Sequence, residues 1–211
     1  KQFNVNADDV HVTSSGGLYH GILYGQGNCS NSIIKNSSVR GNNYVGGMAG
    51  MGTRYNMSQI TIENCDISGN QYVGGFYGNG YYSITYSYII DSKISGVNTS
   101  STYVGGFVGS TNSSVNNSGI YHSSIINPGN YTGGISGGDA GSIYLNSVQD
   151  CIISGNNYVG GLAGMTDGVN PGRTFRDNTI QATITASGTG AGGISGYYQN
   201  NYIDTSGSGL R

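Results

Sequence analysis

A seven-residue motif recurs along the chain at nearly regular intervals. It consists of an aromatic residue, a small or β-branched residue, two glycines, an apolar residue, a small residue and a third glycine. Five copies are clear, at 44–50, 72–78, 103–109, 131–137 and 158–164, and two degenerate copies flank them at 19–25 and 190–196. Measured at the third motif position, the spacings are 25, 28, 31, 28, 27 and 32 residues. Such a period is typical of a solenoid, in which each repeat forms one coil.

The segments between the motif copies favour short strands. Their consensus is Ile-x-x-x-(Ser/Cys)-x-Ile-Ser-Gly, and runs of β-branched residues bounded by turn residues indicate strands. Helix is disfavoured, because glycine costs about 1 kcal/mol per helical position relative to alanine and the chain has 39 glycines. The sequence therefore predicts an all-β protein, a parallel β-solenoid of about seven coils of 25–32 residues. We expect one domain over 1–211, with 1–18 as an N-terminal cap or first partial coil, 19–196 as repeats and 197–211 as a C-terminal cap or tail.

Aligning the coils on the motif tyrosine assigns other positions to columns along the solenoid. The column ten residues before the tyrosine holds Ile34, Ile62, Ile89, Tyr121 and Val148, and the column five residues before it holds Val39, Ile67, Ile94, Ile126 and Ile153. Cys65 and Cys151 share a third column with Ser37, Ser92 and Ser124. Coils stack at about 4.8 Å, so these cysteines lie about 14 Å apart, too far for a disulfide. We interpret this column as a small-residue core ladder.

The paired glycines are the motif's most constant feature. They are Gly46, Gly47, Gly74, Gly75, Gly105, Gly106, Gly133, Gly134, Gly160, Gly161, Gly192 and Gly193. One interpretation is a sharp corner at which φ is positive, which only glycine adopts cheaply. The other is close approach of a neighbouring segment, which a side chain would block. A phosphate-binding loop is disfavoured, because no lysine follows the glycines.

Charge is scarce. Only 9% of residues are charged and the net charge is −2, compared with roughly 25% charged residues in ordinary soluble domains. This balance gives no electrostatic support for nucleic-acid binding. No apolar run approaches the roughly 20 residues of a membrane helix, so we expect no membrane insertion. A polar surface of Ser, Asn, Thr and Tyr is common on secreted and cell-surface proteins. The chain begins at Lys1 without an initiator methionine, and we expect a piece of a longer protein.

Two of the carboxylates have a spacing that could serve catalysis. Asn64, Asp91 and Asp150 share a column, with Ser123 in the coil between the two aspartates. The stacking distance places Asp91 and Asp150 about 10 Å apart, close to the separation in an inverting glycosidase. The simpler interpretation is that they are solvated turn residues. Asp8 and Asp9, the one adjacent acidic pair, could cap the solenoid or help to hold calcium. We predict no catalytic residue, no metal site and no cofactor.

Tyrosine gives the stronger indication of binding. The chain has 18 tyrosines and no tryptophan. We predict that one cluster forms a ligand-binding surface: Tyr77, Tyr81, Tyr82, Tyr86 and Tyr88. A tyrosine ring offers a flat apolar face with a polar tip, which suits sugars or protein partners. The alternative is that these rings stack as a ladder. A second set, Tyr197, Tyr198 and Tyr202, could bind a ligand or cap the last coil.

The four-residue ends of the motif copies resemble the GLUG motif, as in Gly47-Met48-Ala49-Gly50 and Gly161-Leu162-Ala163-Gly164. The resemblance covers about residues 19–196. That repeat occurs in large bacterial surface proteins, in many adhesins and in the non-catalytic part of IgA-cleaving metallopeptidases. It implies a secreted or surface-anchored β-solenoid similar to a right-handed β-helix. The peptidase activity is not implied, because the zinc signature His-Glu-x-x-His is absent and His11, His20 and His122 are scattered.

These features lead to three functional hypotheses. The first is a secreted or cell-surface structural and interaction module, such as an adhesin, stalk or fibre segment. Its partners would be further copies joined end to end, or a glycan or protein of a host or cell surface. The second is a β-helical domain that binds or cleaves carbohydrate. The third, ice binding, is disfavoured because no regular Thr-x-Thr array is present.

Overall fold

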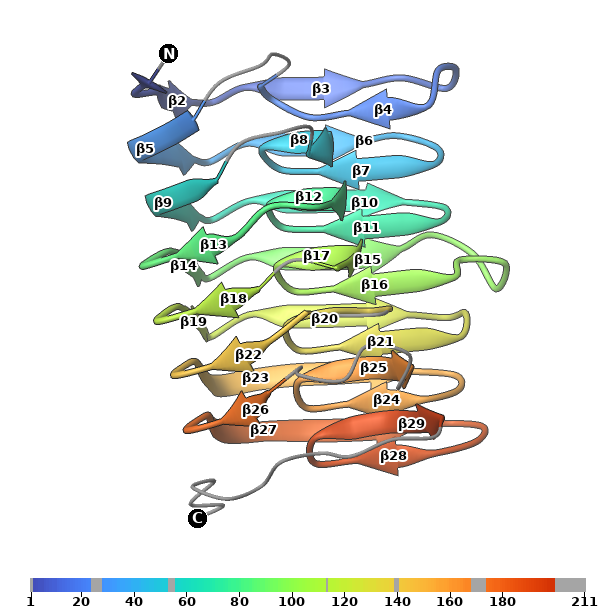
Figure 1. Cartoon of the computed structure of the whole chain (residues 1–211). Coiled ribbons are helices and arrows are strands. Elements are labelled where there is room, and N and C mark those ends of the chain that lie inside the picture. The colour runs from blue at the N-terminus through green and yellow to red at the C-terminus, as the bar shows by residue number, and fades with distance from the viewer. Residues whose placement is uncertain are drawn as a thin grey trace.

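The computed structural model confirms a parallel β-solenoid of about six turns. Its described residues are 2–23, 28–52, 56–112, 114–138, 141–167 and 174–199. Figure 1 shows the coils stacked from β2 at one end to β28 at the other. Within the described ranges no helix is long and apolar enough to cross a membrane. Tyr202 and most of the predicted tail at 197–211 lie outside the described residues.

Three faces run along the stack. The first sheet contains β1 (Gln2–Phe3), β2 (Asn6–Asp8), β3 (His11–Thr13), β5 (Asn28–Lys35), β6 (Ser38–Arg40), β9 (Met57–Glu63), β10 (Asp66–Gly69), β13 (Ile84–Thr85), β14 (Tyr88–Ile90), β15 (Lys93–Gly96), β18 (Val115–Asn116), β19 (Gly119–Tyr121), β20 (Ser124–Asn127), β22 (Ile143–Tyr144), β23 (Ser147–Gly155), β26 (Phe175–Arg176) and β27 (Thr179–Ala186). The second sheet contains β4 (Tyr19–His20), β7 (Tyr44–Gly46), β11 (Tyr72–Gly74), β16 (Tyr103–Gly105), β21 (Tyr131–Gly133), β24 (Val159–Gly160) and β28 (Ala191–Gly192). The third face contains β8 (Ala49–Gly52), β12 (Tyr77–Gly80), β17 (Val108–Thr111), β25 (Ala163–Asp167) and β29 (Ser195–Gln199). Each of the seven motif copies supplies one strand of the second sheet.

The predicted columns are correct in most coils and wrong by one residue in the fifth, which contains the motif copy at 131–137. Ile89 pairs with Ile120 and not with the predicted Tyr121, and Ile94 pairs with Ile125 and not with Ile126. The small-residue column likewise contains Ser123 in place of Ser124, because Lys93 pairs with Ser124. The cause is the turn between β20 and β21, which spans 128–130 and is one residue longer than the turn at 156–157 between Gly155 and Tyr158.

The motif glycines are required for close packing and not for positive φ. Among the described glycines, only Gly17 and Gly190 have positive φ. A Cβ at Gly105 would lie 2.0 Å from the carbonyl oxygen of Val108, within the same motif copy. A Cβ at Gly106 would lie 2.1 Å from the carbonyl oxygen of Gly134, in the next coil. The prediction of a positive-φ corner is therefore wrong, and the close-approach interpretation is confirmed.

Apolar and aromatic ladders fill and flank the core. The inward residue after each glycine pair is buried in Met48, Phe76, Phe107, Ile135 and Leu162. The motif tyrosines stack on the outside of the second sheet, with successive ring centroids 4.8–5.2 Å apart, from Tyr19 through to Tyr158. Like residues thus lie on one another along the axis, and each coil buries its neighbour's apolar surface.

The last coil departs from the repeat. Gly190, with φ of 76°, replaces the motif tyrosine. The ring of Tyr197 closes the tyrosine ladder instead, tilted by 57° against Tyr158 at 4.9 Å. In β27 no residue pairs with Asp150, because the register shifts between Gln149 and Cys151.

Candidate interaction surfaces

The first sheet bends at two corners, each formed by a column of residues in the left-handed conformation. The first corner column has φ of 49–57° and contains Asp9, Asn36, Asn64, Asp91, His122 and Asp150. The second has φ of 47–57° and contains Asn31, Gln59, Tyr86, Asn117, Leu145 and Asp177. Asn and Asp tolerate this conformation, whereas Leu and Tyr adopt it at a cost. The corners therefore fix the backbone and leave the identity of the side chain open.

A column of hydroxyls and thiols stabilises the first corner. Ser92 Oγ accepts a hydrogen bond from the Cys65 amide at 3.1 Å and donates one to the Ile90 carbonyl at 2.8 Å. Ser123 Oγ accepts from the Ser92 amide at 3.0 Å in the same way. Each side chain replaces a backbone bond that the bend removes. Cys65 Sγ donates to the Glu63 carbonyl at 3.2 Å, which makes it an equivalent member of the column.

The cysteines are buried and unpaired, as the spacing predicted for Cys65 and Cys151. Burial raises the pKa of the Cys65 and Cys151 thiols, since it disfavours the thiolate. Within the described ranges, no three His, Cys, Asp or Glu side chains are grouped so that they could hold a metal ion. The thiols thus act as small core groups.

The carboxylates of Asp91 and Asp150 flank a histidine and not the predicted Ser123. His122 Nδ1 lies 3.7 Å from Asp91 Oδ1, and His122 Nε2 lies 3.6 Å from Asp150 Oδ2. All three side chains are about 60% exposed. They line a cleft of about 550 Å³ together with Lys93 and Asp66. Sequence reasoning missed His122 because of the extra residue in the fifth coil, which shifted the alignment by one.

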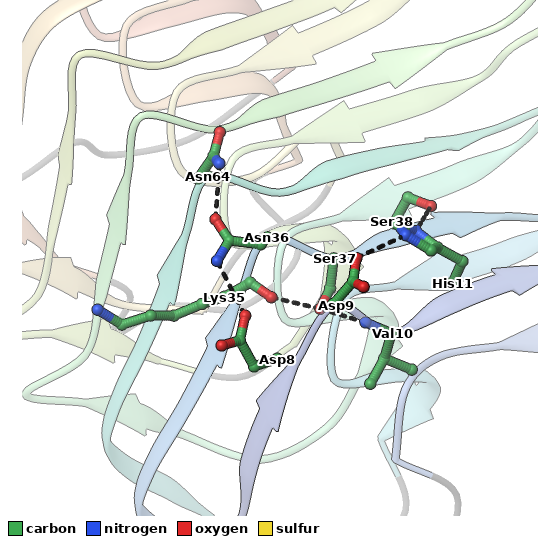
Figure 2. A network of polar contacts seen from close by, with 9 residues as sticks. All are labelled: Asp8, Asp9, Val10, His11, Lys35, Asn36, Ser37, Ser38 and Asn64. Carbon is green, nitrogen blue, oxygen red and sulfur yellow. Dashed lines mark hydrogen bonds and ion pairs between the residues drawn. The ribbon is translucent and has the colours of Figure 1, made fainter.

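A polar network closes the N-terminal end of the first corner (Figure 2). Asn64 Nδ2 donates to Asn36 Oδ1 at 2.7 Å, and Asn36 Nδ2 donates to Asp8 Oδ1 at 2.9 Å. Asp9 Oδ1 instead lies 3.1 Å from His11 Nε2. The adjacent carboxylates of Asp8 and Asp9 thus have different protein partners, an arrangement that suits a cap.

The predicted tyrosine cluster is divided between the core and the surface. Tyr77, on β12, is only 3% exposed, and burial raises the pKa of its phenol. Tyr81 and Tyr86 are each 56% exposed. Tyr88, on β14, is 39% exposed, and its ring lies 6.4 Å from that of Tyr121. Tyr82 is half-buried. Tyr77 therefore packs inside the solenoid, and the other four reach its surface.

Comparison with known proteins adds no relative. No protein-family model matches the chain, and no curated protein or solved structure matches it.

Proposed function

We propose that the chain is a non-catalytic structural and interaction module of a secreted or cell-surface protein, such as a segment of an adhesin, stalk or fibre. The observation that carries this proposal is the unbroken parallel register from β4 to β28 on the second sheet. Six intervals at about 4.8 Å give a stack about 29 Å long along its axis. A repeat of this kind extends a surface by adding coils, which suits a spacer or a platform.

Side-chain ladders strengthen the connection between coils. On the turn side, Asn98 Nδ2 donates to Asn70 Oδ1 at 2.8 Å, and Asn70 Nδ2 donates to Asn42 Oδ1. On the second sheet the tyrosine rings form a parallel aromatic stack. Contacts of this kind resist bending because each one spans adjacent coils. They support a mechanical role, and the low charge is compatible with an extracellular surface.

We further propose that copies of the chain join end to end. On the exposed side of the last coil, Ile180, Ile184 and Ile194 are only partly buried. A Cβ added at Gly193 would meet no atom within 4 Å. Among the described strands, β27 and β28 each pair on one side only. An open strand edge of this kind is a template for another chain.

Surface labelling tests the location. Antibodies raised against the purified 211-residue chain should label intact cells of the source organism, and mild protease treatment of those cells should remove the label. A cytosolic enzyme provides the matched control and should be labelled only after permeabilisation. If the chain behaves like that control, the proposed location is wrong. Sedimentation at increasing concentration tests end-to-end joining, and strict monomers at millimolar concentration would contradict it.

A carbohydrate-cleaving role is the second candidate, and the cleft at Asp91, His122 and Asp150 favours it. The assay is the release of reducing ends from neutral and acidic polysaccharides. The proposed non-catalytic role predicts no release above that of an Asp91→Asn variant. Release by the wild-type chain that disappears in Asp91→Asn would replace our proposal with the enzymatic one.

A further inference from the structure

A groove runs along the outer face of the first sheet from β6 to β27. It has a volume of about 860 Å³, and four hydroxyl side chains of the same outward column line it: Ser68, Ser95, Ser154 and Thr185. A second hollow of about 570 Å³ adjoins it and shares Arg40 and Val97 with it. The two together extend the depression to Thr13, in the first coil.

Small residues and one long loop form the groove. Serine at the outward position leaves the floor low. The connection from β15 to β16, residues 97–102, is the longest of those that lead from the first sheet to the second, and it projects from the stack beside β16 (Figure 1). Val97, in this loop, is 48% exposed and lines the groove. The amide ladder through Asn98 and Asn70 holds the loop at its neighbouring coil.

Ser95 is the most informative residue of the floor. It is only 8% exposed, and its hydroxyl has no hydrogen-bond partner among the described residues. Its neighbour Ser68 accepts from Arg40 Nε at 3.3 Å. The Ser95 oxygen itself is not fully buried, since among the described residues the fully buried side-chain oxygens without a partner are Thr132 Oγ1 and Ser147 Oγ. It is therefore open to the groove, where a ligand hydroxyl would give it a hydrogen-bond partner.

The lining selects among ligand classes. Its charged residues are Arg40, Asp66 and Lys93, and the half towards β27 is neutral, with Asn127, Asn156 and the apolar Ile126 and Pro128. A polyanion is held mainly by Lys and Arg, so this neutral half offers a polyanion few binding contacts. An extended peptide that adds to a sheet needs a free strand edge. The floor strands offer none, since β10, β15, β20 and β23 are each paired on both sides.

We propose that this groove binds a neutral, linear polysaccharide whose chain lies along the solenoid axis. The hydroxyls form two pairs, Ser68 with Ser95 and Ser154 with Thr185, and Ile126 lies in the column between the pairs. Within each pair the hydroxyls are one coil, about 4.8 Å, apart and would meet the hydroxyls of successive sugars. Val97, Ile126 and Pro128 would contact the apolar faces of the rings. The inference rests on the proposed interaction role and gives it a ligand class.

Calorimetric titration of the whole chain tests the proposal. The probes are hexasaccharides of β-1,4-linked glucose, xylose and mannose, with hexagalacturonate as the anionic comparator. We expect at least one neutral probe to bind, and Ser95→Tyr or Ser154→Tyr to weaken its binding at least tenfold by filling the groove. Thr183→Tyr is the control, because it places the same ring on the outer face of β27 outside the lining, and it should leave binding unchanged.

Three results would overturn the proposal. They are no binding of any neutral probe at millimolar concentration, tighter binding of hexagalacturonate, and equal binding by Ser95→Tyr and Thr183→Tyr. Thermal unfolding of each variant shows whether it is folded, and Ser154→Tyr provides a second test if Ser95→Tyr is not. If sedimentation instead shows dimers that Ser95→Tyr abolishes, the groove holds a second copy and the glycan assignment is wrong. Surface labelling does not depend on the groove, so it tests the location separately.

Discussion

The two halves of each coil constrain the sequence in different ways. Where the second sheet packs on the third face, the same glycines recur from coil to coil, and a Cβ at the first glycine of each pair would lie 1.9–2.2 Å from a carbonyl oxygen. At the two corners of the first sheet, the left-handed backbone recurs equally well, yet the side chains range from Asp and Asn to His122, Tyr86 and Leu145. The glycine-packed half requires a particular residue type, whereas the corners require only a backbone conformation.

This difference separates folding from function along the repeat. Substitution in the glycine-packed half meets main-chain atoms, so sequence there is constrained by the fold. A corner side chain points outward from a fixed backbone, and it can change without disturbing the stack. The cleft at Asp91 and His122 lies at such a corner. Surface chemistry can therefore differ between coils while the architecture stays constant.

The largest effect should come from a methyl group in the glycine-packed half. Gly105→Ala places a Cβ 2.0 Å from the Val108 carbonyl oxygen and 2.5 Å from the Gly137 amide. Both are main-chain atoms that cannot rotate away, so we expect a loss of about 4 kcal/mol or more in the free energy of unfolding. Urea unfolding followed by circular dichroism measures it.

Gly193→Ala is the matched control for that experiment. It is the second glycine of the same motif in the last coil, where a Cβ would meet nothing within 4 Å. We expect a change of less than about 0.5 kcal/mol. If both alanines cost the same, loss of glycine itself and not the close approach of the strands would explain the constancy of the motif.

The sequence predicted those parts of the structure in which the same residue types recur from coil to coil. The motif gave the solenoid, its period and the columns of most coils. It could not place the extra residue of the fifth coil, because aligning on Tyr131 leaves open whether that residue lies in the strand or in the turn. His122 was missed for this reason. The groove was not predicted, because the small outward serines and the long loop form a depression only when the coils are stacked.

The corners can be recognised in the sequence, although not from the corner residue itself. Leu145 and Tyr86 do not suggest positive φ, since glycine and Asn dominate that region. The residue after most corners, however, is Ser, as in Ser37, Ser92 and Ser123, or Cys or Asn. This pairing reflects the hydrogen bond that the bent backbone needs, and it identifies corners better than the corner residue does.

Removal of that bond should give the second-largest effect. Ser92→Ala leaves the buried Cys65 amide without its acceptor, which is now 3.1 Å away. We expect a loss of about 1–3 kcal/mol, the cost of an unsatisfied buried group. Ser92→Cys is the control, because Cys65 and Cys151 already occupy this column, and it should cost less. Equal losses in thermal unfolding would mean that the hydroxyl column is not required at the corner.

Thr132 breaks the apolar column that runs inside the second sheet. It pairs with Val104 and Val159 in the neighbouring coils, and its buried hydroxyl has no hydrogen-bond partner in the part of the chain that the structure describes. Thr132→Val keeps the shape and removes the unpaired hydroxyl, so we expect a gain of about 1 kcal/mol. Val104→Thr is the reciprocal variant and should lose a similar amount. A loss for Thr132→Val in urea unfolding would show that the hydroxyl is in fact bonded, to water for example.

The smallest change in stability should come from substituting a corner residue, Leu145. Leu145 has φ of 57° and is 47% exposed, so its side chain adds little packing while its Cβ opposes the left-handed backbone. Leu145→Asn should raise the free energy of unfolding by about 0.5–1 kcal/mol, because asparagine tolerates this conformation. Leu145→Ala lacks the short polar side chain through which asparagine tolerates this conformation, and it should give no gain. If alanine stabilises as much as asparagine, the destabilisation by Leu145 comes from exposing its apolar side chain and not from its left-handed backbone. The corner positions would then restrict the residue type even less than proposed.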